Sequence, residues 1–287
     1  MKYLKNIKNK LDWEKYYNPE FNWNSREFYF NNNLSEEFIE EFYKKINWQY
    51  LSYFYSPSEN LMNNFLYFWN WTYVLQHVKV SEFLLRNVID KIIIDKNCWI
   101  VISAYQTLSE DFIREFKDKL DWGEIYRNQK LSEDFIREFK NKITIYEICR
   151  YQKLSEEFIE ELLHNISEYS VSAKSTAILI QTILKFQKLS DDFIKRNIGI
   201  FFRDDIYDIF RYQKLSEDTI NLVINSYNMF SAEWSILAQK QNLSEEFLIK
   251  YRKNIGWENI LCFQKIAKET VNKYLNEIPE NYRKLKK

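Results

Sequence analysis

The chain has 287 residues, enough for one large domain or two ordinary ones, and its 41 basic and 41 acidic side chains give a net charge of zero. This balance provides no net field to draw the protein to nucleic acid or to an anionic membrane. With three Gly and three Pro, the chain lacks material for hairpin turns and Gly-rich phosphate loops, so we expect helices joined by short polar connections.

Targeting and redox signals predict a soluble protein. The start, "MKYLKNIKNKLDW", has basic residues but no apolar segment of the signal-peptide kind, and no stretch approaches 18 uncharged apolar residues. Cys98, Cys149 and Cys262 are scattered and form neither a CxxC pair nor a disulfide framework. We therefore expect a cytoplasmic location, a reducing compartment and no membrane partner.

Residues 1–33 precede the repeats described below and contain an aromatic-rich insertion after Trp13. We predict that this segment caps the apolar end of a helical stack, as repeat proteins require; the alternative is that it binds a partner. The candidate partner-binding residues are Tyr16, Tyr17, Phe21, Trp23, Phe28, Tyr29 and Phe30.

A repeat begins at Leu34 and continues to about residue 278. The ten residues "LSEDFIREFK" occupy 108–117 and return unchanged at 131–140. The first letter of this motif defines an anchor in each of ten copies: Leu34, Pro57, Val80, Leu108, Leu131, Leu154, Leu189, Leu215, Leu243 and a degenerate Ile266. A Trp or Ile lies nine positions before each later anchor, and all length variation falls between the "LSEDF" segment and this residue.

Each "LSEDF" segment is expected to begin a helix, which we call helix A. In the copy at 108, Ser109 is placed as the N-cap, followed by two acidic residues that suit the positive end of the helix dipole. Leu108 and Ile113 can form a hydrophobic staple across the cap. Phe112, Ile113, Phe116 and Leu120 mark one apolar face at a helical period.

A second, shorter helix, helix B, is expected in "DWGEIYRNQK", with Asp121 as its cap and Trp122, Ile125 and Tyr126 turned inward. Helices shorter than about 12–15 residues are marginal alone in water, so each copy must pack on its neighbours. The predicted fold is an all-α, right-handed-type α-solenoid of about ten short two-helix repeats, curved or superhelical. It has an N-terminal cap at 1–33, the repeats at 34–278 and a basic tail at 279–287.

The motif "YQKLSEEFI" (Tyr151 to Ile159) and its relatives resemble a family of short, about 23-residue, two-helix tandem repeats associated with bacteriophage and giant-virus proteins. The resemblance covers about nine-tenths of the chain. It implies a viral or mobile-element origin and a binding role, and it supplies no catalytic motif.

Gln stands seven positions after the Trp or Ile in seven consecutive copies: Gln106, Gln129, Gln152, Gln187, Gln213, Gln241 and Gln264. A row of amides could recognise a ligand, as some helical repeats recognise RNA. Because the spacing between Gln and the next anchor never varies, we favour a structural role, in which each Gln bonds backbone groups at the turn between helix B and helix A.

Charge is sorted along each copy, with acidic pairs at the starts of helix A and basic residues at its ends. A basic edge could follow phosphates, although dipole complementation and solubility are the favoured explanation. The candidate basic edge comprises Lys44, Lys45, Lys117, Lys119, Lys140, Lys142, Arg252 and Lys253.

Catalytic and metal-binding patterns are missing from the sequence. His77 and His164 lie far apart with no partner at metal-ligand spacing, and Cys149 and Cys262 fall in helix B segments, where a thiol is usually a core filler. The Ser-rich insertion at 166–177 is predicted to be a loop on the variable edge. We expect no catalytic residues, no metal and no cofactor.

The sequence thus predicts a non-enzymatic solenoid that binds another protein. The resemblance adds a narrower expectation, a phage-encoded inhibitor that blocks a host defence protein in the host cytoplasm. Two alternatives remain open: sequence-tolerant nucleic-acid binding along the basic edge, and a structural, virion-associated role.

Overall fold

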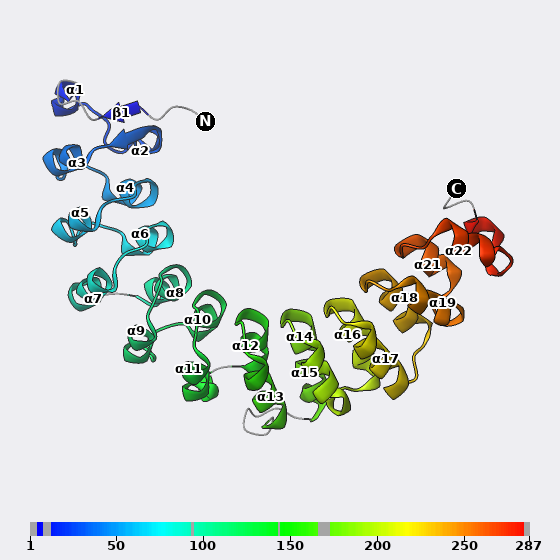
Figure 1. Ribbon diagram of the computed structural model, residues 1–287. Coiled ribbons are helices and arrows are strands. Elements are labelled where there is room, and N and C mark those ends of the chain that lie inside the picture. The colour runs from blue at the N-terminus through cyan, green and yellow to red at the C-terminus, as the bar shows by residue number, and fades with distance from the viewer. Residues whose placement is uncertain (1–4, 8–12, 93–94, 143, 166–172, 284–287) are drawn as a thin grey trace. The chain divides into compact units, whose positions relative to one another are not determined.

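A computed structural model describes residues 5–7, 13–92, 95–142, 144–165 and 173–283 of the protein (Figure 1). Its contacts divide the chain into two compact units, Met1–Phe135 and Ile136–Lys287. The regular secondary structure of the described residues is almost entirely helical, and helices of successive copies pack on one another in chain order. The predicted all-α solenoid of paired helices is confirmed.

The first unit contains two rows of helices, visible along the blue and green parts of Figure 1. The helix A row is α3 (Glu36–Phe42), α5 (Glu59–Asn64), α7 (Glu82–Lys91) and α9 (Glu110–Glu115); the helix B row is α4 (Trp48–Phe54), α6 (Trp71–His77), α8 (Lys96–Tyr105) and α10 (Trp122–Asn128). Two short helices, α1 (Glu14–Tyr17) and α2 (Arg26–Asn31), precede them, and α2 packs on α4. The boundary between the units falls within α11 (Glu133–Glu138).

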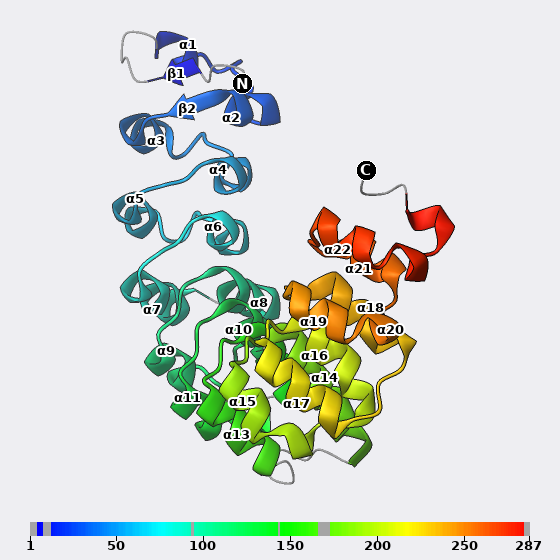
Figure 2. The same ribbon diagram turned by 45° about the vertical axis from the view of Figure 1, so that its right-hand side comes forward.

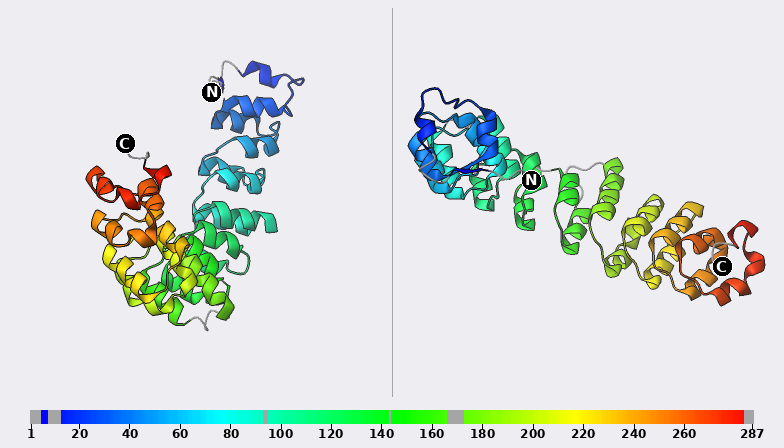
Figure 3. Two further views of the ribbon diagram at one scale, coloured as in Figure 1. Left: turned by 90° about the vertical axis from the view of Figure 1, so that its right-hand side faces the viewer. Right: turned by 90° about the horizontal axis from the view of Figure 1, so that it is seen from above.

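The second unit repeats this arrangement (Figures 2 and 3). Its helix A row is α13 (Glu156–His164), α15 (Asp191–Arg196), α17 (Glu217–Ser226), α19 (Glu245–Lys250) and α22 (Lys268–Lys273); its helix B row is α12 (Ile145–Tyr151), α14 (Ala173–Phe186), α16 (Ile206–Tyr212), α18 (Ser231–Lys240) and α21 (Trp257–Phe263). Shorter pieces are α20 (Arg252–Ile255) and the 3-10 turns η2 (Lys140–Lys142), η4 (Ile198–Ile200), η5 (Arg203–Asp205), η6 (Leu275–Glu277) and η7 (Glu280–Tyr282).

Helix A begins where the sequence predicts and ends earlier. Every anchor is followed two residues later by the first residue of a helix, and the Ser109 side chain accepts the Phe112 N–H, as expected of an N-cap. Phe112, Ile113 and Leu120 are buried, but α9 ends at Glu115 and Phe116 is half-buried in the C-cap position. Six residues leave only one and a half turns, so the helix depends on its neighbours for stability.

Helix B is positioned by its first residues. The Asp121 side chain accepts the Glu124 N–H, which confirms the predicted cap, and Ile125 and Tyr126 are buried as expected, whereas Trp122 is half-buried. The indole N–H of Trp122 donates to the Lys117 carbonyl at 2.9 Å. The same bond joins Trp48 to Tyr43 and Trp71 to Leu66. The Trp therefore fixes the connection that leads from helix A to helix B.

The extra residues of the longer copies mainly lengthen helices. Helices α7, α8, α17 and α18 have ten residues each, and α14 has 14, against six or seven in the short copies. The predicted loop at 166–177 is therefore wrong for its second part, since residues 173–177 form the start of α14; residues 166–172 lie outside the described residues. A longer α14 is favoured because its added turns contribute further apolar side chains, such as those of Leu179 and Ile180, to the core.

The recurrent Gln bonds a turn, as predicted, but in Gln106, Gln129, Gln187, Gln213, Gln241 and Gln264 the turn belongs to the preceding copy. Gln213 is buried; its amide NH₂ donates to the carbonyls of Leu184 and Gln187, and its carbonyl accepts the Leu189 N–H at 2.9 Å. The same three-bond pattern is made by Gln106, Gln129, Gln187, Gln241 and Gln264. We call these the glutamine bonds. They satisfy carbonyls that the end of helix B leaves unpaired.

A second set of bonds joins successive copies at the start of helix A. The Glu156 carboxylate accepts both the backbone N–H and the hydroxyl of Ser190, the N-cap of the next copy, at 2.5 and 2.8 Å. Glu36, Glu59, Glu82 and Glu217 bond the next Ser in the same way. The acidic residue therefore has two roles: it bonds the N-cap of the next copy, and its charge suits the positive end of its own helix dipole.

The first turn of the repeat is bonded by a strand, and the Gln position of the following copy is Tyr55. Strand β1 (Lys5–Ile7) runs parallel to β2 (Asn32–Leu34), with Asn6 opposite Asn33. This two-stranded sheet is the exception to the all-α fold within the described residues. Its second strand ends on the first anchor, immediately before α3 begins.

Candidate functional site

The predicted aromatic residues divide into a buried cluster and an exposed pair. Tyr16 and Phe28 are buried, and their rings lie 5.0 and 6.4 Å from the ring of Phe38 on α3. Phe21 and Trp23 are half-buried, with Trp23 5.3 Å from Phe42. These rings cover the apolar end of the first repeat copy.

Tyr29 belongs to the same cluster and is fixed by two hydrogen bonds. Its hydroxyl donates to the Trp23 carbonyl at 2.9 Å and accepts the Asn47 N–H at 2.7 Å. Burial raises the pKa of Tyr29 to about 12, partly offset by the bond from Asn47. The hydroxyl therefore stays protonated and connects α2 to the cap of α4.

Tyr17 and Phe30 are exposed, on different parts of the surface. The Tyr17 hydroxyl donates to the Glu41 carboxylate at 2.8 Å, and this bond, followed by burial, raises its pKa. Phe30 is 62% exposed and lies on α2, with its ring 5.6 Å from Phe54 of α4. Phe30 alone among the predicted aromatics joins the surface described next.

A partly exposed aromatic patch extends over α2, α4 and α6 in the first unit, with Phe30 and Tyr53 exposed and its other rings half-buried. Its rings are in sequential contact: Phe30 with Phe54, Phe54 with Tyr53 at 4.8 Å, and Tyr53 with Tyr73 at 5.5 Å. Tyr53 is 53% exposed. We define the aromatic patch as Phe30, Tyr50, Tyr53, Phe54 and Tyr73.

The patch contains two open hollows separated by one cation. The first, of about 400 Å³, is lined by Arg26, Gln49, Tyr50, Tyr53, Phe54 and Tyr73; the second, of about 430 Å³, is lined by Arg26, Glu27, Phe30 and Asn31. The Arg26 guanidinium lies over the Phe54 ring, 5.4 Å from its centroid. A ligand on this surface would therefore meet apolar rings around a positive centre.

Four members of the patch were not predicted from the sequence. Tyr50 and Tyr73 each stand two positions after a Trp, in "WQYLSYF" and "WTYVLQH". That position is polar in five of the seven other copies and apolar in two, at Val101 and Ile236. A search for aromatics at a position that is polar in most copies would have found Tyr50 and Tyr73.

The predicted basic edge does not lie on helix A. Because the helices end early, Lys44 and Lys45 follow α3, and Lys117 and Lys119 follow α9. In the second unit, Lys140 and Lys142 lie in η2, and Arg252 and Lys253 lie in α20. Several of these cations already have a partner. Lys44 lies over the ring of Tyr43, Lys45 over that of Phe42 and Lys119 over that of Trp99. Arg252 donates to the Glu277 carboxylate.

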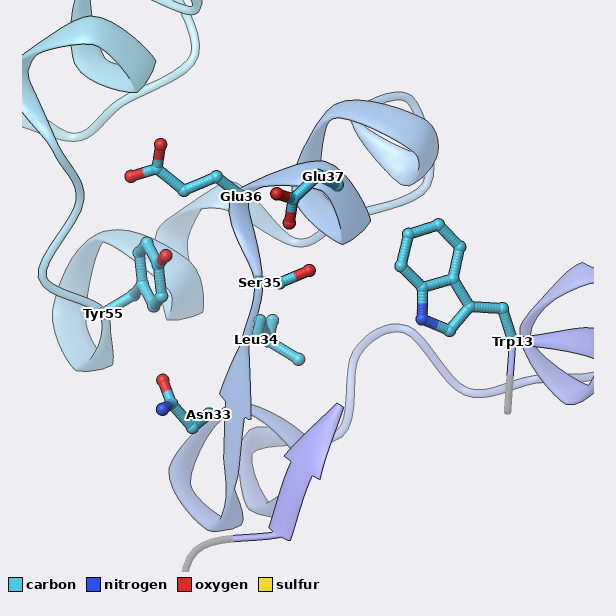
Figure 4. Close-up of a pocket in the computed structure, with 7 residues that line it drawn as sticks. All are labelled: Trp13, Asn33, Leu34, Ser35, Glu36, Glu37 and Tyr55. Carbon is cyan, nitrogen blue, oxygen red and sulfur yellow. The ribbon is translucent and has the colours of Figure 1, made fainter. Parts of the chain in front are cut away.

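A third hollow of the first unit surrounds the turn that leads into α3 (Figure 4). It measures about 610 Å³ and is lined by Trp13, Asn33, Leu34, Ser35, Glu36, Glu37 and Tyr55. The Glu36 carboxylate is bonded to Ser58 of the next copy. Burial, with the charges of Glu36 and Glu37, raises the pKa of Tyr55 to about 12, so this phenol stays protonated at neutral pH.

The described ranges contain no group of three His, Cys, Asp or Glu side chains placed to bind a metal ion. Nor does any helix in them combine the length and apolarity that crossing a bilayer requires.

The chain has no recognisable relative in the three comparisons made: no protein-family model matches it, and neither curated proteins nor solved structures show significant similarity to it.

Proposed function

We propose that the protein is a non-enzymatic scaffold that binds another protein through the aromatic patch of α2, α4 and α6. The observation that supports this proposal most strongly is the run of touching rings from Phe30 to Tyr73, in which Phe30 and Tyr53 are exposed and Phe54 and Tyr73 are half-buried. Exposed contiguous apolar surface of this kind marks interaction sites on soluble proteins.

The composition of the patch suits a protein partner. Tyr and Phe supply large contact areas with few rotatable bonds, and with Arg they are enriched at the energetic centres of protein interfaces. Arg26 stands between the two hollows, where an acidic side chain of the partner would meet it. The partner is therefore expected to present apolar side chains around a carboxylate.

Folding alone does not account for these rings. The cluster of Tyr16, Phe28 and Phe38 already covers the end of the repeat stack. Tyr53 and Phe30 remain more than half exposed beside it. An aromatic ring left in water does not stabilise the fold, whereas its burial against a partner lowers the free energy of the complex.

Site-specific photo-crosslinking tests the proposal. A benzophenone amino acid replaces Tyr53 in one version of the full chain and Phe83 in another. Phe83 is 80% exposed on α7, outside the patch, so it is a matched control. We expect a discrete crosslinked protein from position 53 and none from position 83.

The captured partner then allows a direct affinity measurement. The double variant Phe30→Ala, Tyr53→Ala is expected to weaken binding about 30-fold or more, as the loss of two anchor residues implies. The control variant Tyr67→Ala, Phe83→Ala removes two rings that are more exposed than Phe30 and Tyr53 and should change the affinity less than about twofold. Equal crosslinking at both positions, or equal loss in both variants, would contradict the proposal.

A narrower version follows from the repeat resemblance alone. In it, the protein is encoded by a phage, and the partner is a host defence protein that it blocks in the host cytoplasm. Crosslinking in infected and uninfected host cells distinguishes this version, because a defence component would be recovered from the host proteome.

A further inference from the structure

A second surface, on the other unit, has a different chemistry. The motif "RYQK" at 150–153 returns as "KFQK" at 185–188 and as "RYQK" at 211–214, in three consecutive copies. In each, a basic residue and an aromatic residue end helix B, the buried Gln follows, and a Lys lies in the turn. We call this surface the aromatic–basic stripe: Arg150, Tyr151, Lys153, Lys185, Phe186, Lys188, Arg211, Tyr212 and Lys214.

The stripe is exposed and its rings alternate with cations. Tyr151, Phe186 and Tyr212 are 40%, 41% and 37% exposed. The Arg150 guanidinium lies over both neighbouring rings, 5.3 Å from the centroid of Tyr151 and 5.2 Å from that of Phe186. It therefore bridges one copy to the next.

An open hollow lies between these two copies. It measures about 340 Å³ and is lined by Arg150, Tyr151, Gln152, Lys153, Leu154, Phe186, Gln187 and Lys188. Gln187 is buried and bonded to the backbone, so it forms the floor. The groups of this hollow that a ligand can contact are two rings and three cations.

Helix-dipole complementation explains part of the positive charge. The stripe follows the C-terminal ends of helix B, and Lys214 donates to the Lys240 carbonyl at 2.5 Å, at the end of the next helix B. It does not explain the rings, because Tyr and Phe carry no charge to offset a dipole. The rings recur at the same position, and each is more than a third exposed.

We propose that the aromatic–basic stripe binds single-stranded nucleic acid with little sequence preference. Proteins that bind single strands in this way combine a positive track for the phosphates with rings on which bases stack. A surface that repeats one ring and two cations in three copies suits a ligand that repeats a planar group and an anion.

Acidic groups beside the aromatic–basic stripe limit the affinity that we expect for a nucleic acid. Asp208 on α16 is close enough for the charges of Arg211 and Lys185 to act on it, and burial, its largest influence, raises its pKa. Acidic residues in the first turn of each helix A, such as Glu157 and Asp192, follow the same turns. Binding is therefore expected to be moderate in affinity and to weaken steeply as salt rises.

Fluorescence anisotropy of the full chain with labelled oligo(dT) and oligo(U) of about 20 nucleotides tests the proposal, starting near 50 mM salt. We expect saturable binding that double-stranded DNA of the same length does not match. The triple variant Arg150→Gln, Lys185→Gln, Arg211→Gln should lower the slope of log affinity against log salt by about 2.

A matched charge control uses cations outside the stripe. Lys195, Lys250 and Lys253 lie on α15, α19 and α20. Their replacement by Gln removes the same charge and should leave binding within about twofold, since they contact no phosphate in this scheme. Equal losses from the two triple variants would overturn the assignment to the stripe.

The rings are tested separately. The variant Tyr151→Leu, Phe186→Leu, Tyr212→Leu keeps apolar surface but removes base stacking, and we expect a loss of at least about tenfold. Circular dichroism confirms that the variant is folded. Unchanged binding, the absence of binding near 50 mM salt, or equal displacement by polyglutamate would each overturn the proposal, the last by indicating an acidic polypeptide. None of these outcomes depends on the aromatic patch.

Discussion

The three cysteines of the chain differ in solvent exposure. Cys98 on α8 and Cys149 on α12 are buried, and burial raises the pKa of their thiols to about 11 and about 12. Cys262 on α21 is exposed, so the prediction that it fills the core, as Cys149 does, is wrong. The thiolate is the reactive form, which makes the two buried thiols inert at neutral pH.

Thiol titration checks this difference. At pH 8 the native protein should react rapidly with one equivalent of an aromatic disulfide reagent, and Cys262→Ser should abolish that reaction. All three thiols should react after denaturation. Rapid reaction of more than one thiol in the native protein would show that α8 or α12 opens locally.

A carboxylate between successive helix A segments gives a pH-dependent contribution to stability. The Glu161 carboxylate accepts hydrogen bonds from Arg137, at 2.6 Å from Nη2, and these bonds lower its pKa. A lowered folded-state pKa means that the contribution is complete above the unfolded pKa of about 4.3 and is lost as the pH falls through the folded value.

The variant Glu161→Gln tests the direction of this pH dependence. At pH 7 it should lower the free energy of unfolding by at most about 1 kcal/mol, because both side chains are partly exposed. The difference from the parent should vanish below about pH 3, measured by urea denaturation across the pH range. Glu246→Gln, on the exposed first turn of α19, is the control for the loss of one carboxylate and should change the free energy of unfolding at pH 7 by no more than about 0.5 kcal/mol.

At the scale of helices, the glutamine bonds are the main polar connection between copies. Gln213→Leu would leave the carbonyls of Leu184 and Gln187 and the N–H of Leu189 without this partner in a buried turn. We expect a loss of about 3 kcal/mol, since each buried group left unbonded costs about 1–3 kcal/mol.

Gln239→Leu is the matched control for this change. Gln239 is exposed on α18 and donates to the Ser235 hydroxyl within the same helix. Its replacement should alter the free energy of unfolding by no more than about 0.5 kcal/mol. Equal effects in thermal and urea unfolding of the two variants would show that the glutamine bonds do not stabilise the stack.

The starts of the helices were predictable because they depend on local chemistry. A Ser cap, acidic residues in the first turn and a staple lie within a few residues of one another, so the sequence contains the whole signal. The ends were not, because Phe116 and Lys117 continue a helical pattern while the chain turns to place Trp122. The turn that each Gln bonds could not be predicted from the sequence either, because it depends on how successive copies stack.

At the scale of the molecule, a repeat stack transmits a disturbance only to its neighbours. Stability in such proteins is approximately a sum of copies and of contacts between adjacent copies. The N-terminal cluster illustrates this, because Phe28 contacts rings of the preceding residues and of α3, the first helix A. A defect there should remain local.

Phe28→Ala tests this locality. We expect the variant to lose about 3–5 kcal/mol in the N-terminal copies, the usual cost of emptying a large buried site. Hydrogen exchange should accelerate in residues 13–64 and remain unchanged in residues 176–264. A uniform acceleration along the chain would show instead that all copies unfold together.

The candidate surfaces were predicted less completely than the fold. Phe30 was identified because it lies in an obviously aromatic segment, whereas Tyr53 and Tyr73 belong to different copies and meet only when α4 packs on α6. The same holds for Arg150 and Phe186, which lie in successive copies and are 5.2 Å apart. Sequence shows which side chains recur, but only packing shows which of them touch.

The glutamine bonds also have a direction along the chain, and this matters while the protein is being synthesised. Each Gln bonds the turn before it, so a copy leaving the ribosome is completed only when the following one has emerged. Folding can then advance from the N-terminus one hairpin at a time, with a single unfinished copy at the growing end. A chain built in this way exposes little apolar surface at any moment of translation.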